Sequence, residues 1–276
     1  MRIVLVIGDG LEHVYVANRL AAGIPLDGIV VDHGRPLGLS QKIRGRFRKY
    51  TLLQVASRLH MAAMARIWRD ESTGRQSMVA AFGAENCQQF ARPDLIQHIH
   101  GINLPEGLQT VSSLQPDVLL IYGTVLVGQK IISQARVLAL NMHTGISPYY
   151  RGSDCAFWPL FNQEPHMVGA TVHQCTKEID GGKIFGTVRA RLSRDDDVFS
   201  VFARAVMAGA GLYVEVVRKL IAGTLTGANQ DLSLGKEYRA LMRDVGAERK
   251  VRRSIKDGLI RRYVESEKSS ATEPQT

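Results

Sequence analysis

The sequence predicts an α/β protein with a Rossmann-like, mostly parallel sheet flanked by helices. Residues 2–31 have the pattern of an apolar strand, a helix and a second apolar strand, which is how many parallel sheets begin. Two further apolar runs, at 117–122 and 137–140, have the length and continuity of buried strands. The long apolar segment at 198–222 has helical spacing and could cover the sheet.

Short apolar or alternating runs give the remaining strands of this prediction. In chain order the predicted strands are 2–7, 26–31, 108–111, 117–122, 137–140, 169–175 and 184–192. Their lengths suit strands rather than helices.

Helical spacing predicts the covering layers. In chain order the helical segments are 11–22, a basic insertion at about 40–70, and 198–222. Residues 71–74 are expected to end the insertion, and the apolar residues 78–83 fit either a helix or a strand. The acidic run that ends at Asp197 predicts the start of the last helix, because acids are favoured in a first turn.

Polar side chains follow two of these strands. Asn141 and His143 are two residues apart, so they are expected to project to one side just beyond the strand at 137–140. The strand at 169–175 leads into an Asp-Gly-Gly turn that presents Asp180 in a loop. Ligands of open α/β sheets bind at such strand ends. An amide, an imidazole and a carboxylate are therefore expected to converge there.

The order of these motifs resembles the folate-dependent formyltransferases, a family that includes the glycinamide ribonucleotide, initiator-tRNA and amino-sugar enzymes. The motifs that carry the resemblance are Asn141-Met-His143, Ile146-Ser-Pro148, Tyr150-Arg-Gly152, Gly169-Ala-Thr-Val-His173, Asp180-Gly-Gly182 and the strand and turn at 117–126. The resemblance covers about residues 112–190 and extends less closely to 1–33. It departs at Thr144-Gly145, where the family usually has Pro-Ser. It implies the formyltransferase fold.

The resemblance also implies a one-carbon transfer, in which a formyl group passes from 10-formyltetrahydrofolate to an amine. It assigns catalysis to Asn141, His143 and Asp180. The first two would face the developing oxyanion, and Asp180 would orient His143 or a water that moves the proton of the amine. Neither a metal ion nor a covalent nucleophile is implied.

Two loops are expected to hold the folate, and two nearby residues are expected to support the site. The folate-binding residues would be Tyr122, Gly123, Thr124, Val125 and Leu126 in one loop and Thr176, Lys177, Glu178 and Ile179 in the other. His173 is expected to pack or to brace a loop. Arg151 is expected to be structural or to position an anion, because its guanidinium stays protonated.

The acceptor is expected to be a small-molecule amine, with a nucleotide-linked amino sugar favoured. Gly10-Leu-Glu12 does not match the phosphate loop of the glycinamide ribonucleotide enzymes. The alternatives are glycinamide ribonucleotide or an amino acid as acceptor, hydrolysis of the formyl-folate, and an RNA-binding module without catalysis. A dinucleotide-binding enzyme is disfavoured, although Asp32 follows the second strand, because His13 occupies the third glycine position of the fingerprint after Gly8.

The chain is predicted to comprise a formyltransferase-like catalytic domain at 1–225, with the helical insertion at about 40–70, and a basic helical extension at 226–276. The extension is expected to begin its helix at 235 and to be disordered at 266–276. It is too short for the separate C-terminal barrel that the resemblance predicts for a tRNA enzyme.

The net charge of +9 arises largely from basic clusters at 42–49 and 236–262, outside the predicted site. Solvated helix faces explain these clusters more simply than nucleic-acid binding does. No apolar run is expected to span a membrane, and a cytoplasmic location is expected because the three cysteines, Cys87, Cys155 and Cys175, form no disulfide or zinc pattern. A homodimer is left open.

Overall fold

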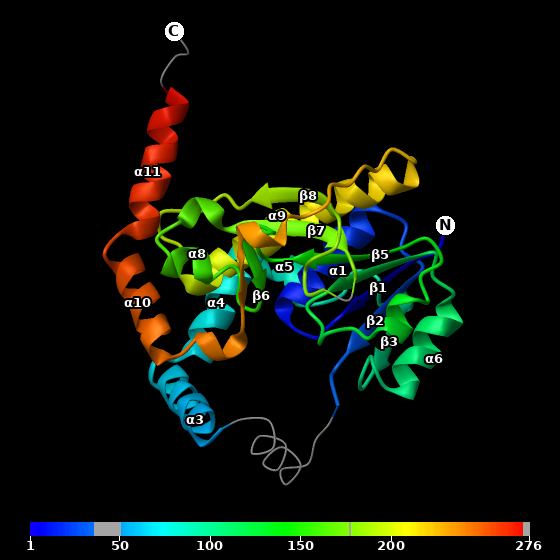
Figure 1. The fold of residues 1–276 in the computed structure, drawn as a ribbon, viewed down its shortest axis with the longest axis horizontal. Helices are drawn as coiled ribbons and strands as arrows, with labels where there is room; N and C mark the ends of the chain where they lie inside the picture. The colour runs from blue at the N-terminus through cyan, green and yellow to red at the C-terminus, as the bar shows by residue number, and fades with distance from the viewer. Residues whose placement is uncertain (36–50, 177, 273–276) are drawn as a thin grey trace.

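The computed structural model describes residues 1–35, 51–176 and 178–272 of the chain. Its centre is a seven-stranded sheet in the order β3-β2-β1-β4-β5-β7-β8 (Figure 1). The strands are β1 (Ile3–Ile7), β2 (Gly28–Asp32), β3 (Ile96–Ile99), β4 (Val118–Tyr122), β5 (Leu138–His143), β7 (Gly169–Gln174) and β8 (Ile184–Arg189). The first five run parallel, whereas β7 is antiparallel to both β5 and β8. The predicted α/β class with a mostly parallel sheet is confirmed.

Helices cover both faces of the sheet. The described helices are α1 (Leu11–Gly23), α3 (Leu52–Ile67), α4 (Asp70–Phe82), α5 (Ala84–Cys87), α6 (Pro105–Leu114), α7 (Gln129–Ile132), α8 (Trp158–Phe161), α9 (Val198–Ile221), α10 (Val245–Lys256) and α11 (Leu259–Thr272). Alternate side chains of β1 face opposite layers. Leu5 packs in the core beneath α1 and α9, and Val6 packs in the core beneath α6 and α7. A strand covered on both faces must be apolar throughout, as β1 is.

Helix α9 is fixed at its start and at its centre. The Asp197 carboxylate accepts hydrogen bonds from the backbone N–H groups of Phe199 and Ser200, both at 2.8 Å. The buried Tyr213 hydroxyl donates to Leu140 O at 2.8 Å and accepts from Ile121 N at 3.0 Å, so α9 is bonded to β4 and β5. Among the described residues α9 is the one helix long and apolar enough for a membrane span, but 61% of that stretch is buried inside the protein.

The expected break at 71–74 is wrong, because these residues lie inside α4. The chain turns earlier, at Arg69, whose φ of 55° is left-handed. Gly74 allows a close helix contact instead of ending a helix, since a Cβ there would lie 2.9 Å from the Phe199 ring. The ambiguous segment at 78–83 belongs to the same helix as far as Phe82.

The predicted strand at 108–111 is also wrong, since these residues lie in α6. Pro105 occupies the first turn of that helix, where its missing N–H costs nothing. The strand of this region is β3, which sequence analysis missed because only its last residue, Ile99, is fully buried. As the edge strand of the sheet, β3 carries polar side chains at Gln97 and His98.

The C-terminal extension contributes a strand before it becomes helical. Residues expected to begin a helix at 235 form β9 (Lys236–Tyr238), which pairs in parallel with β6 (Tyr150–Gly152). Two helices follow, and in Figure 1 the end of α11 points away from the body of the protein. The stretch expected to be disordered from 266 is helical to Thr272.

Part of the predicted insertion lies in α3, which begins with a capping box between Thr51 and Gln54. Residues 36–50, and with them the basic cluster at 42–49, lie outside the described residues. We keep the boundary at 225 as a proposal, with α9 ending just before it at Ile221.

Candidate active site

Strand β5 carries Asn141 and His143 in its last three residues, so both lie within the strand and not beyond it as expected. The strand is longer than predicted because β7 pairs with this end, with His173 opposite Asn141 and Thr171 opposite His143. This antiparallel register adds a third polar side chain, His173, to the same edge. Asn141 and His143 still share one face of β5, as their spacing predicts.

Asp180 reaches these strand ends from the turn that follows β7. Its φ of 49° is left-handed, a conformation that Asp tolerates better than most residues do. Gln230 bridges the turn, because its Nε2 donates to Asp180 O at 2.8 Å and to Gly182 O at 2.5 Å. The Gly152 N–H donates to Asp180 Oδ2 at 2.9 Å. The carboxylate is therefore directed toward the strand ends.

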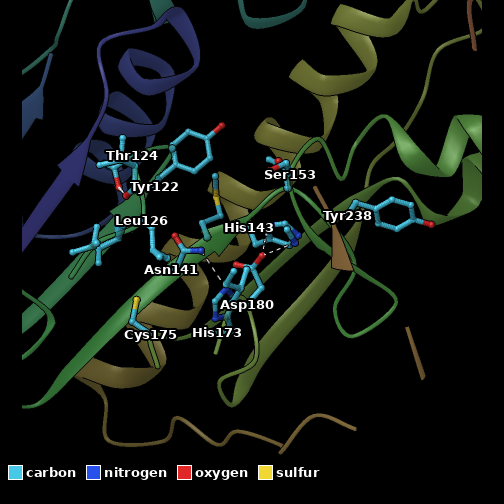
Figure 2. A pocket seen from close by; sticks show the side chains of 18 of the residues that line it. Tyr122, Thr124, Leu126, Asn141, His143, Ser153, His173, Cys175, Asp180 and Tyr238 are labelled. Atoms are coloured by element: carbon cyan, nitrogen blue, oxygen red, sulfur yellow. Dashed lines mark hydrogen bonds and ion pairs between the residues drawn. The ribbon is translucent and has the colours of Figure 1, made fainter. Parts of the chain in front are cut away.

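The structure brings the three predicted catalytic residues together around the Asp180 carboxylate (Figure 2). His143 Nδ1 lies 3.5 Å from Asp180 Oδ2, and His173 Nε2 lies 3.3 Å from Asp180 Oδ1. The Asn141 side-chain nitrogen lies 3.2 Å from the same nitrogen of His173. His173 thus contacts two of the three predicted residues, and its expected bracing role is compatible with this position.

The Asp180 carboxylate has an environment that favours its ionised form. Burial by itself raises the pKa of Asp180, but the neighbouring His143 and His173 and the Gly152 N–H outweigh burial and hold the pKa well below its usual range. We therefore expect Asp180 to carry a negative charge throughout the neutral pH range.

Burial and a neighbouring carboxylate have opposite effects on the pKa of His143. Burial lowers the pKa of His143, and the Asp180 carboxylate opposes that shift. Its Nε2 lies 3.0 Å from Tyr150 O, so both ring nitrogens face oxygen atoms. Only the doubly protonated ring can donate to both oxygens, whereas burial favours the neutral ring. These opposing effects suit a group that exchanges protons.

These side chains line a cavity of about 520 Å³ that also contains both predicted folate loops. The lining residues from those loops are Tyr122, Gly123, Thr124, Val125, Leu126, Thr176, Glu178 and Ile179, and Lys177 lies outside the described residues. Val125, Leu126 and Ile179 are 60%, 76% and 41% exposed, which is high for apolar side chains. Exposed apolar side chains around a few polar groups are typical of a binding site for a small organic ligand.

His13 is a supporting residue that sequence analysis treated only as a mismatch. Its Nδ1 accepts from Gly10 N at 2.8 Å, which leaves the Nε2–H to donate to Gly123 O at 2.9 Å. The imidazole therefore connects the loop after β1 with the first folate loop. A Cβ on Gly123 would lie 2.2 Å from His13 Nε2, and the φ of Gly123 is +62°. The glycine is thus needed both for its conformation and for the space it leaves.

Sequence analysis also missed the C-terminal residues of the site, Gln230 and the segment 237–240. Glu237, Tyr238 and Arg239 line the cavity. They reach it because β9 pairs with β6, a contact between segments over eighty positions apart in the chain. No local pattern predicts such a pairing, and the sequence KEY is too short to be recognised as a strand.

Two other polar residues considered from the sequence, Asp32 and Arg151, make hydrogen bonds that hold loops of the protein together. Asp32 accepts hydrogen bonds from Gly34 N at 2.9 Å and Ile102 N at 3.0 Å, so its carboxylate holds two loops together and is not presented to a ribose. Arg151 donates to Pro148 O and Leu232 O, which is a structural role. Trp158 and its neighbour Phe157 are buried core residues.

The fold and the site together define a class of protein. It is an α/β protein with an amide, two imidazoles and a carboxylate at its strand ends, beside a cavity lined by two loops that expose the apolar side chains Val125, Leu126 and Ile179. Residues 88–217 match the sequence model described as formyl transferase. This part of the chain is therefore similar to the formyl transferases.

Individual relatives differ in the acceptor that their names indicate. A methionyl-tRNA formyltransferase of Lacticaseibacillus casei is 30% identical over 164 residues, which cover 59% of this chain and 51% of the relative. The chain therefore spans about half the length of that relative.

Solved structures share the fold at low identity. A sugar N-formyltransferase from Shewanella sp. matches with a TM-score of 0.53 and 14% identity, over 87% of this chain and 77% of its own. A phosphoribosylglycinamide formyltransferase from Streptococcus pneumoniae matches with a TM-score of 0.50 and 18% identity, over 80% and 99%. The predicted formyltransferase fold is confirmed.

Proposed function

We propose that the protein transfers a formyl group from 10-formyltetrahydrofolate to the amine of a small acceptor. The observation that carries this proposal is the convergence of Asn141, His143 and Asp180 on one wall of a cavity framed by the two predicted folate loops. The match of residues 88–217 to the formyl transferase model supports the same reaction.

The residues of the cavity fit a reduced folate. Its ring system is flat and edged with hydrogen-bonding groups, so it needs apolar contact on its faces and polar groups at its edge. Leu126 and Ile179 supply exposed apolar surface from opposite loops. The left-handed Gly123 creates a turn in which backbone groups can approach a ligand closely.

The chemistry requires stabilisation of charge and movement of one proton. The amine forms a bond to the formyl carbon, the formyl oxygen becomes negative, and the bond from that carbon to the folate nitrogen then breaks as that nitrogen takes up a proton. In this proposal the Asn141 amide and the His143 ring donate to the oxyanion, a contribution of about 3–4 kcal/mol for one such donor. The ionised Asp180 stabilises the imidazolium form of His143 that a proton transfer creates.

His143 must rearrange its hydrogen bonds to act in this way. Its Nε2 now lies against Tyr150 O, and its Nδ1 lies against Asp180. The ring can reach a formyl oxygen only when one N–H leaves its present acceptor. Asp180 would then hold the ring through the other nitrogen.

A nucleotide-linked amino sugar is our preferred acceptor. Glu12 lines the cavity at the loop after β1, and a carboxylate there disfavours the phosphate that the glycinamide ribonucleotide enzymes bind in this region. The structural similarity to a sugar N-formyltransferase is compatible with this preference. Methionyl-tRNA is the second candidate, because the relative in Lacticaseibacillus casei carries that name.

The test has two measurements. Calorimetry with 5-formyltetrahydrofolate should show saturable binding to the folded protein, and complete absence of binding would contradict the proposal. Product analysis with 10-formyltetrahydrofolate should show tetrahydrofolate released only when an amine is present. Nucleotide amino sugars and methionyl-tRNA are supplied in parallel. Release of formate without any amine would favour hydrolysis instead.

A further inference from the structure

The cavity has a second wall whose role the proposed reaction does not assign. Figure 2 places Tyr122, Thr124 and Leu126 on one side of the Asp180 carboxylate and Ser153 and Tyr238 on the other. Glu237 and Arg239 line the cavity beside Tyr238. If the folate occupies the loops on the first side, the acceptor must approach the formyl carbon from this second wall.

The backbone of the second wall is held firmly. Tyr238 stacks on Trp158 with ring centres 4.7 Å apart and on Tyr150 at 5.6 Å. Asn162 donates to the hydroxyl groups of both tyrosines, at 3.0 Å each. Ser153 N donates to Tyr238 O at 2.8 Å. A rigid support of this kind is what a binding residue needs.

The extended backbone of this segment directs alternate side chains to opposite sides. The Tyr238 ring lies in the aromatic stack, so Glu237 and Arg239 project from the opposite side of the segment, and all three residues contribute to the lining of the cavity. Arg239 is the one lysine or arginine among the described lining residues, and its side chain is 79% exposed. The guanidinium therefore lies at the rim, while the triad lies inside.

The Arg239 side chain is oriented but has donors to spare. Its Nε lies 3.3 Å from Glu237 Oε1, and among the described residues no side chain bonds its two terminal nitrogens. Those nitrogens form the planar fork that binds phosphate oxygens in pairs. A nucleotide-linked amine that places its amino group at His143 would extend its phosphates outward toward this rim.

We propose that Arg239, oriented by Glu237, binds the diphosphate of the acceptor and so selects phosphorylated amines. This inference rests on the proposed function, and it concerns the acceptor and not the formyl donor. Its chemistry, a guanidinium with an anion, would also suit the carboxylates of a folate glutamate tail, so the experiment must separate the two ligands.

The experiment is calorimetric titration of the full chain with UDP, dTDP, GDP and inorganic pyrophosphate, and separately with 5-formyltetrahydrofolate carrying one or three glutamates. Arg239→Ala should weaken the tightest-binding diphosphate about tenfold or more and leave both folates unchanged. Arg239→Lys should restore part of the affinity, because it keeps the charge but loses the fork.

The matched control is Arg92→Ala. Arg92 pairs with Asp94 two residues away, as Arg239 pairs with Glu237, but it does not line the cavity. It should leave every affinity unchanged. The proposal is overturned if no diphosphate binds or if Arg239→Ala leaves diphosphate affinity unchanged. It is also overturned if Arg239→Ala and Arg92→Ala weaken diphosphate binding equally, or if Arg239→Ala weakens only the binding of the triglutamate folate. Failure of folate binding alone would sink the proposed function and leave the diphosphate result standing.

Discussion

Asp180 is held on several sides, and each contact limits what the carboxylate can do. Its two oxygens face His143 and His173, the Gly152 N–H donates to one of them, and Gln230 bonds the backbone carbonyl. A carboxylate fixed in this way loses little freedom when a substrate binds. Preorganisation of this kind is the main source of electrostatic catalysis.

At the residue scale we expect the triad to act on the transition state. Asn141→Ala, His143→Ala and Asp180→Asn should each lower kcat by about 10²-fold or more, because each removes an oxyanion donor or the partner of the proton-transfer group. The measurement is formyl transfer to an amine, with folate affinity determined separately for each variant.

Combining these substitutions should cost much less than the product of the single effects, because the groups act as a unit. Near-normal turnover in all three single variants would mean that the motifs are structural. A loss confined to folate affinity would place the chemistry elsewhere.

At the scale of the element, the first folate loop depends on a residue outside it. His13→Ala should weaken binding of 5-formyltetrahydrofolate by about five- to tenfold, since it removes the partly buried hydrogen bond to Gly123 O that fixes the turn. Calorimetry measures the affinity. His60, which is exposed on α3, provides the control, and an equal loss in His60→Ala would contradict this role.

Glycines in two helices should respond oppositely to the same substitution. Gly74→Ala should destabilise the protein by about 1–3 kcal/mol, because the new Cβ would lie 2.9 Å from the Phe199 ring. Gly211→Ala in α9 meets nothing within 4 Å and should stabilise it by roughly 0.5–1 kcal/mol through helix propensity. Urea unfolding compares the two variants, and stabilisation by Gly74→Ala would show that α4 and α9 are not closely packed there.

At the scale of the whole molecule, the free energy of unfolding should fall as the pH falls, in two separate windows. Burial places the folded-state pKa of His143 below its unfolded value near 6.5, so stability falls as the pH drops below about 6.5. The folded-state pKa of Asp180 also lies below its unfolded value, so its contribution is present above about pH 4 and is lost as the pH falls toward the folded pKa.

Urea unfolding at a series of pH values separates these windows. The stability difference between the wild-type protein and Asp180→Asn should shrink below about pH 4, because the carboxylate of the unfolded chain is then protonated while that of the folded protein is still ionised. The loss that begins as the pH falls below about 6.5 should be smaller in His143→Ala. Stability curves that stay parallel across both windows would contradict these assignments.

Sequence analysis predicted the sheet and the site most reliably where the signal is local. Asn141 and His143 share a strand and Asp180 sits in an Asp-Gly-Gly turn, so their spacing and motif order could be read directly. The close contact at Gly74 and the pairing of β9 could not be predicted from the sequence, because each depends on a partner that is distant in the chain. The roles assigned to the site residues stay predictions.

The contact between Gln230 and the Asp180 turn has a consequence for the order in which the site forms during protein synthesis. Gln230 leaves the ribosome fifty residues after Asp180, and β9 follows it. A growing chain can therefore assemble the strands from β1 to β8 while the turn with the carboxylate still lacks its clamp. Because this long-range contact needs residue 230, the turn that carries Asp180 would be fixed later than the strands around it.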